Sequence, residues 1–392
     1  MSGPPPSAHP GDAAALRALL EAVPVAGLSA LRVRVPFRRP FATATGMWLH
    51  REAWILLLRA IDGRVGLGEA VLEPDATEVE ETILARAIRE TTGRAREGDL
   101  PDAEELELLG GPGRAFRAAL DAARLDLALA PDGIAVPVNG TIGFAAPRQG
   151  AEAAMQAIEA GFRTLKLKAG AERETEDLVA RVRAIRQAVG PDIRLRLDVN
   201  GAWDLPTAED RLLAVARFDV EYVEQPLPWD DTAGAAELRE RVGVPIAADE
   251  AVYSSGAARA LLAAGAADVL VVKPVRVGGP VAVAEIAAMA LSRGVPVVLS
   301  TLFETGIGVA AARAAAAALP LVPWHDAVGR PPHGLATAGL LEHDLLRDPL
   351  VLEGGELAAP GGEGSAGLGV ALDDRVLRRF AVEAVEAVEA AG

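Results

Sequence analysis

From residue 134 onward the chain repeats one unit, a short apolar run followed by a stretch with apolar residues at helical spacing. The apolar runs recur every 24 to 30 residues, at 136–142, 164–168, 193–199, 220–224, 245–248, 269–273 and 295–299, with a last one near Leu321. Strands and helices that alternate in this way predict parallel strands with helical crossovers. Eight units in succession favour a closed α/β barrel of the TIM type, with an open, doubly wound sheet as the alternative.

The segments on either side of the repeats have other patterns. Before them, strand-like runs at 31–35, 53–58 and 63–68 are followed by helical spacing over 78–92 and 114–130, which is typical of an α+β unit. After Gly339 the rhythm stops, and the chain passes through the glycine-rich stretch 354–369 into an Ala-, Val- and Glu-rich end that we expect to be a helix. We expect this tail to pack back on the N-terminal unit.

The first 27 residues are rich in Pro, Gly and Ala and lack the basic start and continuous apolar stretch of a secretion signal. They predict a loose extension that ends in a short helix. The predicted domains are a flexible extension over 1–27, a capping domain over 28–133, a barrel over 134–340 and a C-terminal segment over 341–392.

The choice of basic residues is unusual. Of the 39 basic residues, 36 are Arg and only three are Lys, namely Lys166, Lys168 and Lys273. A coding bias toward Arg explains why lysine is rare, but it does not explain why the three lysines all lie in strand-like runs. The sharper interpretation is that these positions need an amine that can lose its proton, which Arg cannot do. Chance survival is the alternative.

Ionisable side chains stand at the ends of five neighbouring predicted strands, where barrel enzymes carry their reactive groups. In chain order these residues are Lys168, Asp198, Glu224, Asp249 and Lys273. The two-residue alternation of a strand turns Leu165, Leu167, Leu195 and Leu197 toward the helices. It therefore turns Lys166, Lys168, Arg196 and Asp198 toward the barrel axis.

Asp198, Glu224 and Asp249 predict a metal site made only of oxygen ligands. Such a set suits a hard cation, with Mg²⁺ favoured and Mn²⁺ as the alternative. A single carboxylate at a strand–helix junction is commonly a helix cap. Three of them at spacings of 26 and 25 residues favour the metal site.

The two end lysines flank this metal site from opposite sides. A lysine near other cations and out of bulk water has a lowered pKa, so Lys168, about 6.5–7 Å from Lys166 on the same strand face, is the predicted general base. Lys273 is the predicted electrostatic partner for an enediolate. A Schiff-base lysine is the rival interpretation, but it leaves the carboxylates without a role.

Five further residues are predicted to bind or support the substrate, and these are Lys166, Arg196, Asn200, Glu250 and Glu304. Glu304 could instead cap the helix that begins there. The run Gly66-Leu-Gly68-Glu69 is interpreted as turn chemistry, and Val277-Gly-Gly-Pro as a turn that could contact an anion.

Charge and composition exclude several classes of partner. A net charge of −16 argues against nucleic acid or an anionic membrane surface, so a small-molecule carboxylate is the expected substrate. The chain has no cysteine, which excludes disulfides and thiolate sites and fits a reducing cytoplasm. No apolar window is long enough to span a membrane.

The set of motifs resembles the muconate-lactonizing subgroup of the enolase superfamily. The motifs are Lys166-x-Lys168, Asp198-x-Asn200, Glu224-Gln-Pro, Asp249-Glu250, Lys273-Pro and Glu304-Thr-Gly-Ile-Gly, and the stretch 36–46 is similar to the specificity loop of that group. The resemblance implies a modified (β/α)7β barrel under a capping domain. It also implies Mg²⁺ on Asp198, Glu224 and Asp249, catalysis by Lys168 and Lys273, and a tendency to form homo-oligomers.

Within the subgroup, three runs are most similar to the o-succinylbenzoate synthases of menaquinone biosynthesis, namely 138–142, the Glu304 motif and 333–341. The resemblance then implies a dehydration in which Lys168 takes the α-proton and returns it to the departing hydroxyl. Dipeptide epimerases usually carry an Asp-x-Asp pair where this chain has Trp324-His325-Asp326, with one Asp only. Racemases of N-succinylamino acids, dipeptide epimerases and muconate cycloisomerases stay open, as does a non-catalytic barrel.

Overall fold

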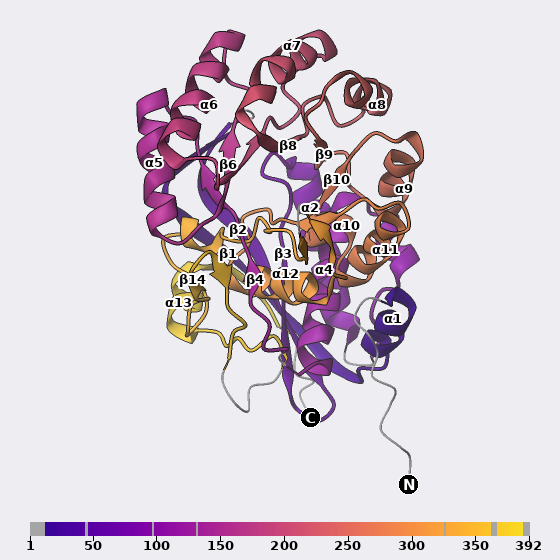
Figure 1. Ribbon diagram of the computed structural model, residues 1–392. Coiled ribbons are helices and arrows are strands. Elements are labelled where there is room, and N and C mark those ends of the chain that lie inside the picture. Colours follow the sequence, from indigo (N-terminus) through magenta and orange to yellow (C-terminus); the bar gives the residue numbers. More distant parts are fainter. Residues whose placement is uncertain are drawn as a thin grey trace, which may run out of the picture.

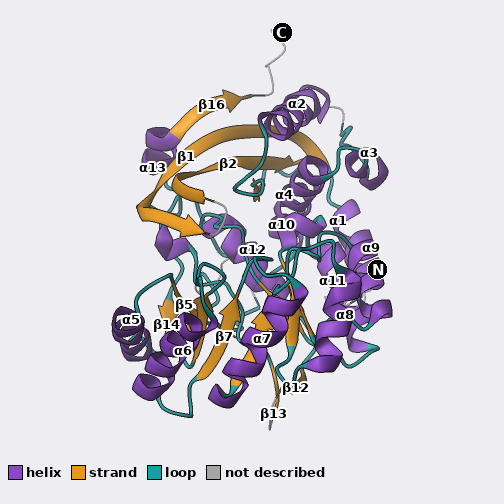
Figure 2. Ribbon diagram, turned by 90° about the horizontal axis from the view of Figure 1, so that it is seen from above, coloured by secondary structure: helices purple, strands orange, loops and turns teal. Residues whose placement is uncertain are grey.

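The structure is a computed structural model that describes residues 12–43, 46–95, 98–130, 132–324, 327–361 and 367–386. The fold consists of two layers, each a sheet with its own helices (Figure 1). A curled parallel sheet is surrounded by helices on its outer face, and an antiparallel sheet with its own helices lies against the barrel. Figure 2, the view from above, shows the antiparallel strands arching beside the ring of barrel helices.

The predicted parallel barrel is confirmed. Seven strands are hydrogen-bonded in the order β11-β10-β9-β8-β7-β6-β5. They are β5 Gly140–Ile142, β6 Thr164–Lys168, β7 Arg194–Asp198, β8 Val220–Glu224, β9 Ile246–Ala248, β10 Val269–Val272 and β11 Val297–Leu299. The helices between and after them are α5 Pro147–Glu159, α6 Thr175–Val189, α7 Leu205–Val215, the 3-10 turn η2 Ala216–Phe218, α8 Thr232–Arg241, α9 Ser255–Ala264, α10 Pro274–Val277, α11 Pro280–Leu291 and α12 Gly306–Ala318.

The two faces of the sheet divide the side chains as the alternation predicts. Leu165, Leu167, Leu195 and Leu197 are fully buried in the large core between the strands and the outer helices. A smaller apolar cluster fills the barrel interior and consists of Tyr222, Ala247, Val269, Val271, Val298 and Trp324. The charged residues of β6 and β7 share this inner face, above the apolar floor.

A strand forms near Leu321, as predicted, but it lies outside the barrel sheet. In the described part of the chain, β12 Val322–Trp324 pairs only with β13 Ala327–Gly329, as an antiparallel hairpin. Pro320 and Pro323 have no N–H to donate, so this run is a poor central strand. The barrel closes instead at His333 and Gly334, which bridge to Val138 and Ser300 in parallel register.

The N-terminal sheet has the order β16-β1-β2-β3 and is antiparallel throughout. Its strands are β1 Val25–Thr43, β2 Gly46–Ala60, β3 Val65–Ala70 and β16 Ala381–Val385, and its helices are α2 Glu78–Arg94, α3 Ala103–Glu107 and α4 Gly111–Ala128. The remaining elements are β4 Val136–Pro137, β14 Leu352–Glu353, β15 Glu356–Leu357, η3 Ala338–Leu340 and α13 Asp374–Phe380.

The predicted C-terminal helix is also wrong in part. Residues 374–380 are helical, but Ala381–Val385 is a strand that pairs with β1 through Ala30↔Val385 and Leu31↔Ala384. Helix propensity loses here because the open edge of β1 offers backbone hydrogen bonds that a strand can complete. Residues 387–392 lie outside the described part.

The short helix predicted at the end of the N-terminal extension is present, and it packs on the rest of the fold instead of being loose. Asp12 caps helix α1 Ala13–Glu21 by accepting hydrogen bonds from Ala14 N and Ala15 N at 3.0 and 3.2 Å. Leu16 and Leu20 are buried in a cluster with residues of α4, α11 and α12. The helix thus joins the N-terminal layer to the barrel, while residues 1–11 lie outside the described part. None of the described helices is both long and apolar enough to cross a membrane.

We expect Leu20→Ala to lower the free energy of unfolding by about 2–5 kcal/mol, because a buried leucine leaves a cavity that the surroundings refill only partly. Leu20 is 1% exposed. Leu108→Ala is the matched control, since Leu108 is 87% exposed and its loss should cost within about 0.5 kcal/mol. Denaturant titrations followed by circular dichroism measure both. Equal midpoints for the two variants would show that α1 does not contribute to stability.

Candidate active site

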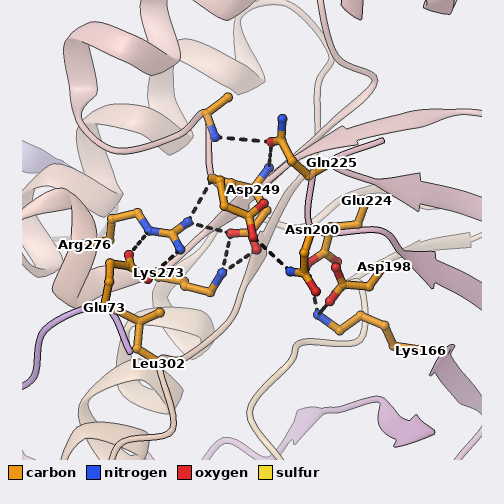
Figure 3. Close-up of polar contacts among 12 residues, drawn as sticks. Glu73, Lys166, Asp198, Asn200, Glu224, Gln225, Asp249, Lys273, Arg276 and Leu302 are labelled. Atoms are coloured by element: carbon orange, nitrogen blue, oxygen red, sulfur yellow. Dashed lines mark hydrogen bonds and ion pairs between the residues drawn. The ribbon is translucent and has the colours of Figure 1, made fainter. Parts of the chain in front are cut away.

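A cavity of about 260 Å³ lies at the carboxyl ends of the barrel strands. Its barrel side is lined by Lys166, Lys168, Asp198, Asn200, Asp249, Glu250 and Lys273, all of them predicted site residues. Its other side is closed by Trp48, Glu73, Pro74 and Asp75 from the N-terminal layer. The cavity is therefore a site between the two layers, and Figure 3 shows its polar contacts.

The pair of lysines on β6 reaches the first two predicted metal ligands. The Lys166 ammonium donates to Glu224 Oε1 at 3.0 Å and lies 3.0 Å from Asp198 Oδ2. The Lys168 ammonium donates to the same Asp198 Oδ2 at 2.8 Å and to Asn200 Oδ1 at 2.9 Å. Both lysines are buried. Lys168 is thus held at a fixed position that a substrate can approach from the cavity.

Asn200 connects Lys168 of β6 to the loop after β9. It adopts a left-handed backbone with φ of 51°, a conformation that asparagine tolerates better than most residues. Its amide Nδ2 donates to Glu250 Oε1 at 2.9 Å. Burial, and then repulsion from Asp249, raise the pKa of the Glu250 carboxyl. The two predicted supporting residues therefore form a chain from Lys168 to the loop after β9.

Lys273 occupies the opposite wall, as the sequence predicts. Its ammonium binds both carboxylate oxygens of Asp249, with Oδ1 at 2.5 Å. The Arg276 guanidinium approaches the same Oδ1 at 2.8 Å and donates to the Asp249 carbonyl at 3.0 Å. Arg276 also binds Glu73 of the N-terminal layer, with Nε to Oε1 at 2.5 Å. This guanidinium fastens the layer over the site to the loop that carries Asp249.

Sequence reasoning missed three residues of this network. Gln225 stands after Glu224 with φ of 41°, and its Oε1 accepts from Asp249 N at 3.0 Å and Ala251 N at 3.2 Å. Arg276 and Glu73 are the other two. The Lys273-Pro-Val-Arg276 spacing of one helical turn was a usable signal for Arg276, whereas nothing local in the sequence links Glu73 to it.

The charges around the cavity shift the pKa values of the buried carboxyl groups in opposite directions. Although burial alone would raise it, the ammonium groups of Lys166 and Lys168 lower the pKa of Asp198 to about 2. Burial, and then repulsion from Asp198, raise the pKa of Glu224 to about 8. Burial alone would lower the pKa of Lys166, but Asp198 and Glu224 raise it well above its usual value. Lys166 therefore stays an ammonium, which suits a charged neighbour of the base and not the base itself.

The carboxylates are paired with lysines rather than gathered at one point. Among the residues that the structure describes, no three His, Asp or Glu side chains are already placed to hold a metal ion. The chemistry of the set still fits one, because the predicted ligands present only oxygen atoms and all three are 1% exposed. Asp198 Oδ1 is buried without a hydrogen-bond partner, so it can take a further ligand.

Two predicted supporting residues lie off the cavity wall. Arg196 is fully buried on the barrel floor, where its Nε donates to Glu221 Oε2 at 2.5 Å and its guanidinium lies 4.6 Å from the Tyr222 ring centroid. Glu304 turns back to accept from Leu302 N at 2.5 Å. Neither contacts a lysine of the site within the described residues. His325 and Asp326, which bear on the epimerase alternative, lie outside the described part.

Comparisons with known proteins agree with this geometry. The model of the family described as Enolase C-terminal domain-like matches residues 149–376. The o-succinylbenzoate synthase of Thermobifida fusca (strain YX) is 43% identical over 217 residues, which cover 55% of this chain and 64% of that enzyme. The N-succinylamino acid racemase of an Amycolatopsis species is 30% identical over 374 residues, 88% of this chain and 95% of that enzyme.

A solved structure extends the likeness to the whole fold. The muconate lactonizing enzyme from Pseudomonas fluorescens, complexed with muconolactone, has a TM-score of 0.78 and 25% identity, and the match covers 92% of this chain and 100% of that one. The family model spans more than half of the chain. The chain is therefore an enzyme of the enolase superfamily, in the family described as Enolase C-terminal domain-like.

Proposed function

We propose that this enzyme is a Mg²⁺-dependent hydro-lyase of the o-succinylbenzoate synthase type. The observation that carries the proposal is one cavity with Lys168 on one wall and Lys273 on the other, each bound to a carboxylate. The 43% identical synthase of Thermobifida fusca supports the choice of reaction, although the match spans only 64% of that enzyme. The proposal puts the chain in menaquinone biosynthesis and in the cytoplasm. Residues 28–133 and 341–392 would form its capping layer.

Asp198, Glu224 and Asp249 would hold the metal. When bound, Mg²⁺ supplies positive charge at the substrate carboxylate and so makes the neighbouring C–H bond more acidic. The lysines would then be released from these oxygens toward the substrate. Gln225 keeps the backbone at Asp249 in place, and Arg276 keeps the Asp249 carboxylate turned toward the cavity.

The proton is moved by the chain itself. The proposed substrate is a cyclohexadiene carboxylate that carries a succinyl group and a hydroxyl. Lys168 Nζ takes its α-proton, and Asn200 orients the amine through its 2.9 Å contact. The Lys273 ammonium, on the far wall, stabilises the negative charge of the enediolate. Lys168 then returns the proton to the departing hydroxyl, so that water leaves and the ring becomes aromatic. Lys166 adds a second positive charge on the same strand face, where its ammonium lies between Glu224 and Asp198.

A racemase of N-succinylamino acids is the second candidate. The match to the Amycolatopsis racemase covers 95% of that enzyme, whereas the match to the Thermobifida fusca synthase covers 64% of the synthase. The same two opposed lysines could take a proton from one face of a carbon and return it on the other.

Purified enzyme with Mg²⁺ should consume the cyclohexadiene carboxylate that carries a succinyl group, which is followed by the loss of its absorbance. N-succinylamino acids are tested in parallel in D₂O, where racemisation introduces deuterium at the α-carbon without loss of water. A kcat/KM for the cyclohexadiene carboxylate at least tenfold higher than that for N-succinylamino acids supports the synthase. The reverse order makes the racemase the function, and no reaction with either at micromolar enzyme rejects both.

A further inference from the structure

A carboxylate of the N-terminal sheet crosses into the barrel outside the cavity. Glu69, in β3, is 4% exposed and binds the start of α12. Its Oε1 accepts from Thr305 N at 2.9 Å, and its Oε2 accepts from Thr305 Oγ1 at 2.7 Å and from Gly308 N at 2.9 Å. A carboxylate at a helix N-terminus satisfies free N–H groups and complements the helix dipole. Here the cap comes from the other structural layer.

Glycines on both sides make this contact possible. A Cβ at Gly66 would lie 2.0 Å from Ala123 O, and one at Gly68 would lie 2.0 Å from Ala119 O, so β3 can rest on the backbone of α4 only without those side chains. A Cβ at Gly308 would meet the Glu304 Cβ at 2.6 Å and Glu69 Oε2 at 3.0 Å. The Gly66-Leu-Gly68-Glu69 run, predicted to be turn chemistry, is thus a close-packed strand whose glutamate faces the barrel, and β3 and α12 lie side by side (Figure 1).

The segment that Glu69 fixes leads directly into the cavity wall. Ser300, Thr301, Leu302 and Phe303, which precede Thr305, all line the cavity. Phe303 has a φ of 64°, in the left-handed region that side chains rarely adopt, so the surrounding structure must impose its conformation.

The N-terminal layer also reaches this segment through aromatic rings. The centroid of the Phe303 ring lies 5.9 Å from that of Phe37 and 5.9 Å from that of Trp48. Trp48 itself lines the cavity. The loop before α12 is therefore held at its end by Glu69 and near its middle by two rings, all from the same sheet.

We propose that Glu69 is a positioning residue for substrate binding. It holds the loop 300–305 so that Leu302 and Phe303 keep their places in the lining of the cavity. Glu69 touches neither the lysines nor the predicted metal ligands among the described residues. Its loss should therefore weaken substrate binding and leave proton abstraction intact. This inference rests on the proposed function for its kinetic part only.

The kinetic test is the variant Glu69→Gln, which keeps the shape but exchanges an acceptor for an amide donor that opposes Gly308 N. We expect KM to rise about tenfold or more, as for the loss of one hydrogen bond to a charged group, with kcat within about twofold. Asp126→Asn is the matched control, because Asp126 also accepts from two backbone N–H groups, of Leu67 and Leu368, in the same layer. An equal KM change in both variants, or a fall in kcat in Glu69→Gln, would overturn the inference.

A smaller change guards against misfolding. Thr305→Val removes the hydroxyl that donates to Glu69 at 2.7 Å and also accepts from Ile307 N at 3.4 Å, whereas Thr305→Ser keeps it. We expect a several-fold rise in KM for the valine variant and recovery for the serine variant. Hydrogen exchange gives a readout that needs no substrate. The peptide amides of 301–308 should exchange at least tenfold faster in Glu69→Gln than in Asp126→Asn, and unchanged exchange would reject the positioning role even if the proposed reaction is wrong.

Discussion

Lys168→Ala is expected to lower kcat by about 10²–10⁴-fold, the usual contribution of a positioned general base. The amine lies between Asp198 and Asn200 at 2.8 and 2.9 Å, on the cavity wall. Lys166, the other lysine of the strand, is bound to Glu224 and Asp198 instead of Asn200. Exchange of the substrate α-proton with solvent, measured by NMR in D₂O, reports proton abstraction separately from the later loss of water.

Lys168→Arg separates charge from basicity. The guanidinium restores a cation beside Asp198 but cannot act as a base near neutral pH. We therefore expect Arg to recover folding, measured by the thermal midpoint, while α-proton exchange stays as low as in the alanine variant. Exchange at the wild-type rate in either variant would remove Lys168 from the mechanism.

Chelation should abolish activity, and Mg²⁺ should restore it. The physical reason is that Asp198, Glu224 and Asp249, each 1% exposed, would hold the Mg²⁺ that supplies positive charge at the substrate carboxylate. A cation that binds only the folded chain adds about 2.7 kcal/mol of stability at a hundredfold excess over its Kd. A rise in the thermal midpoint with added Mg²⁺ thus measures binding without a substrate.

Asp249→Asn is the informative variant for the metal, with Asp268→Asn as its control. Asp268 lies at the opposite end of the same pair of strands, just before β10, where it binds Arg239 and the Ile246 N–H. We expect Asp249→Asn to remove both the midpoint shift and the recovery of activity, and Asp268→Asn to keep both. Full activity after exhaustive chelation would rule out a metal-dependent reaction.

The parallel barrel and its inner charges were accessible from sequence because they follow from local periodicity. Strand alternation alone turns Lys166, Lys168 and Asp198 inward, and the structure has the same arrangement on β6 and β7. Residues just beyond the end of a strand could be predicted for the same reason. Asn200, two residues beyond Asp198, reaches Lys168 without any long-range information.

The remainder depends on contacts between distant segments, which periodicity does not encode. Arg276 meets Glu73 across 203 residues, and Glu69 meets Thr305 across 236. The strand at 381–385 exists because β1 leaves an edge open, and α1 is ordered because Leu16 and Leu20 pack against residues of α4 and α11. The barrel closes at His333 and not, as predicted, near Leu321, because prolines exclude the earlier run from the sheet.

The distribution of amines has a practical consequence for chemical labelling. All three lysines of the chain lie in one cavity and are at most 9% exposed, while the outer surface carries its positive charge as guanidinium groups. Reagents that acylate amines, and that modify most proteins at scattered surface lysines, would find here only the α-amino terminus and the lysines of this cavity. A small acylating probe therefore becomes a site-directed reagent for this enzyme, and protection from it by a substrate analogue would report occupancy of the site.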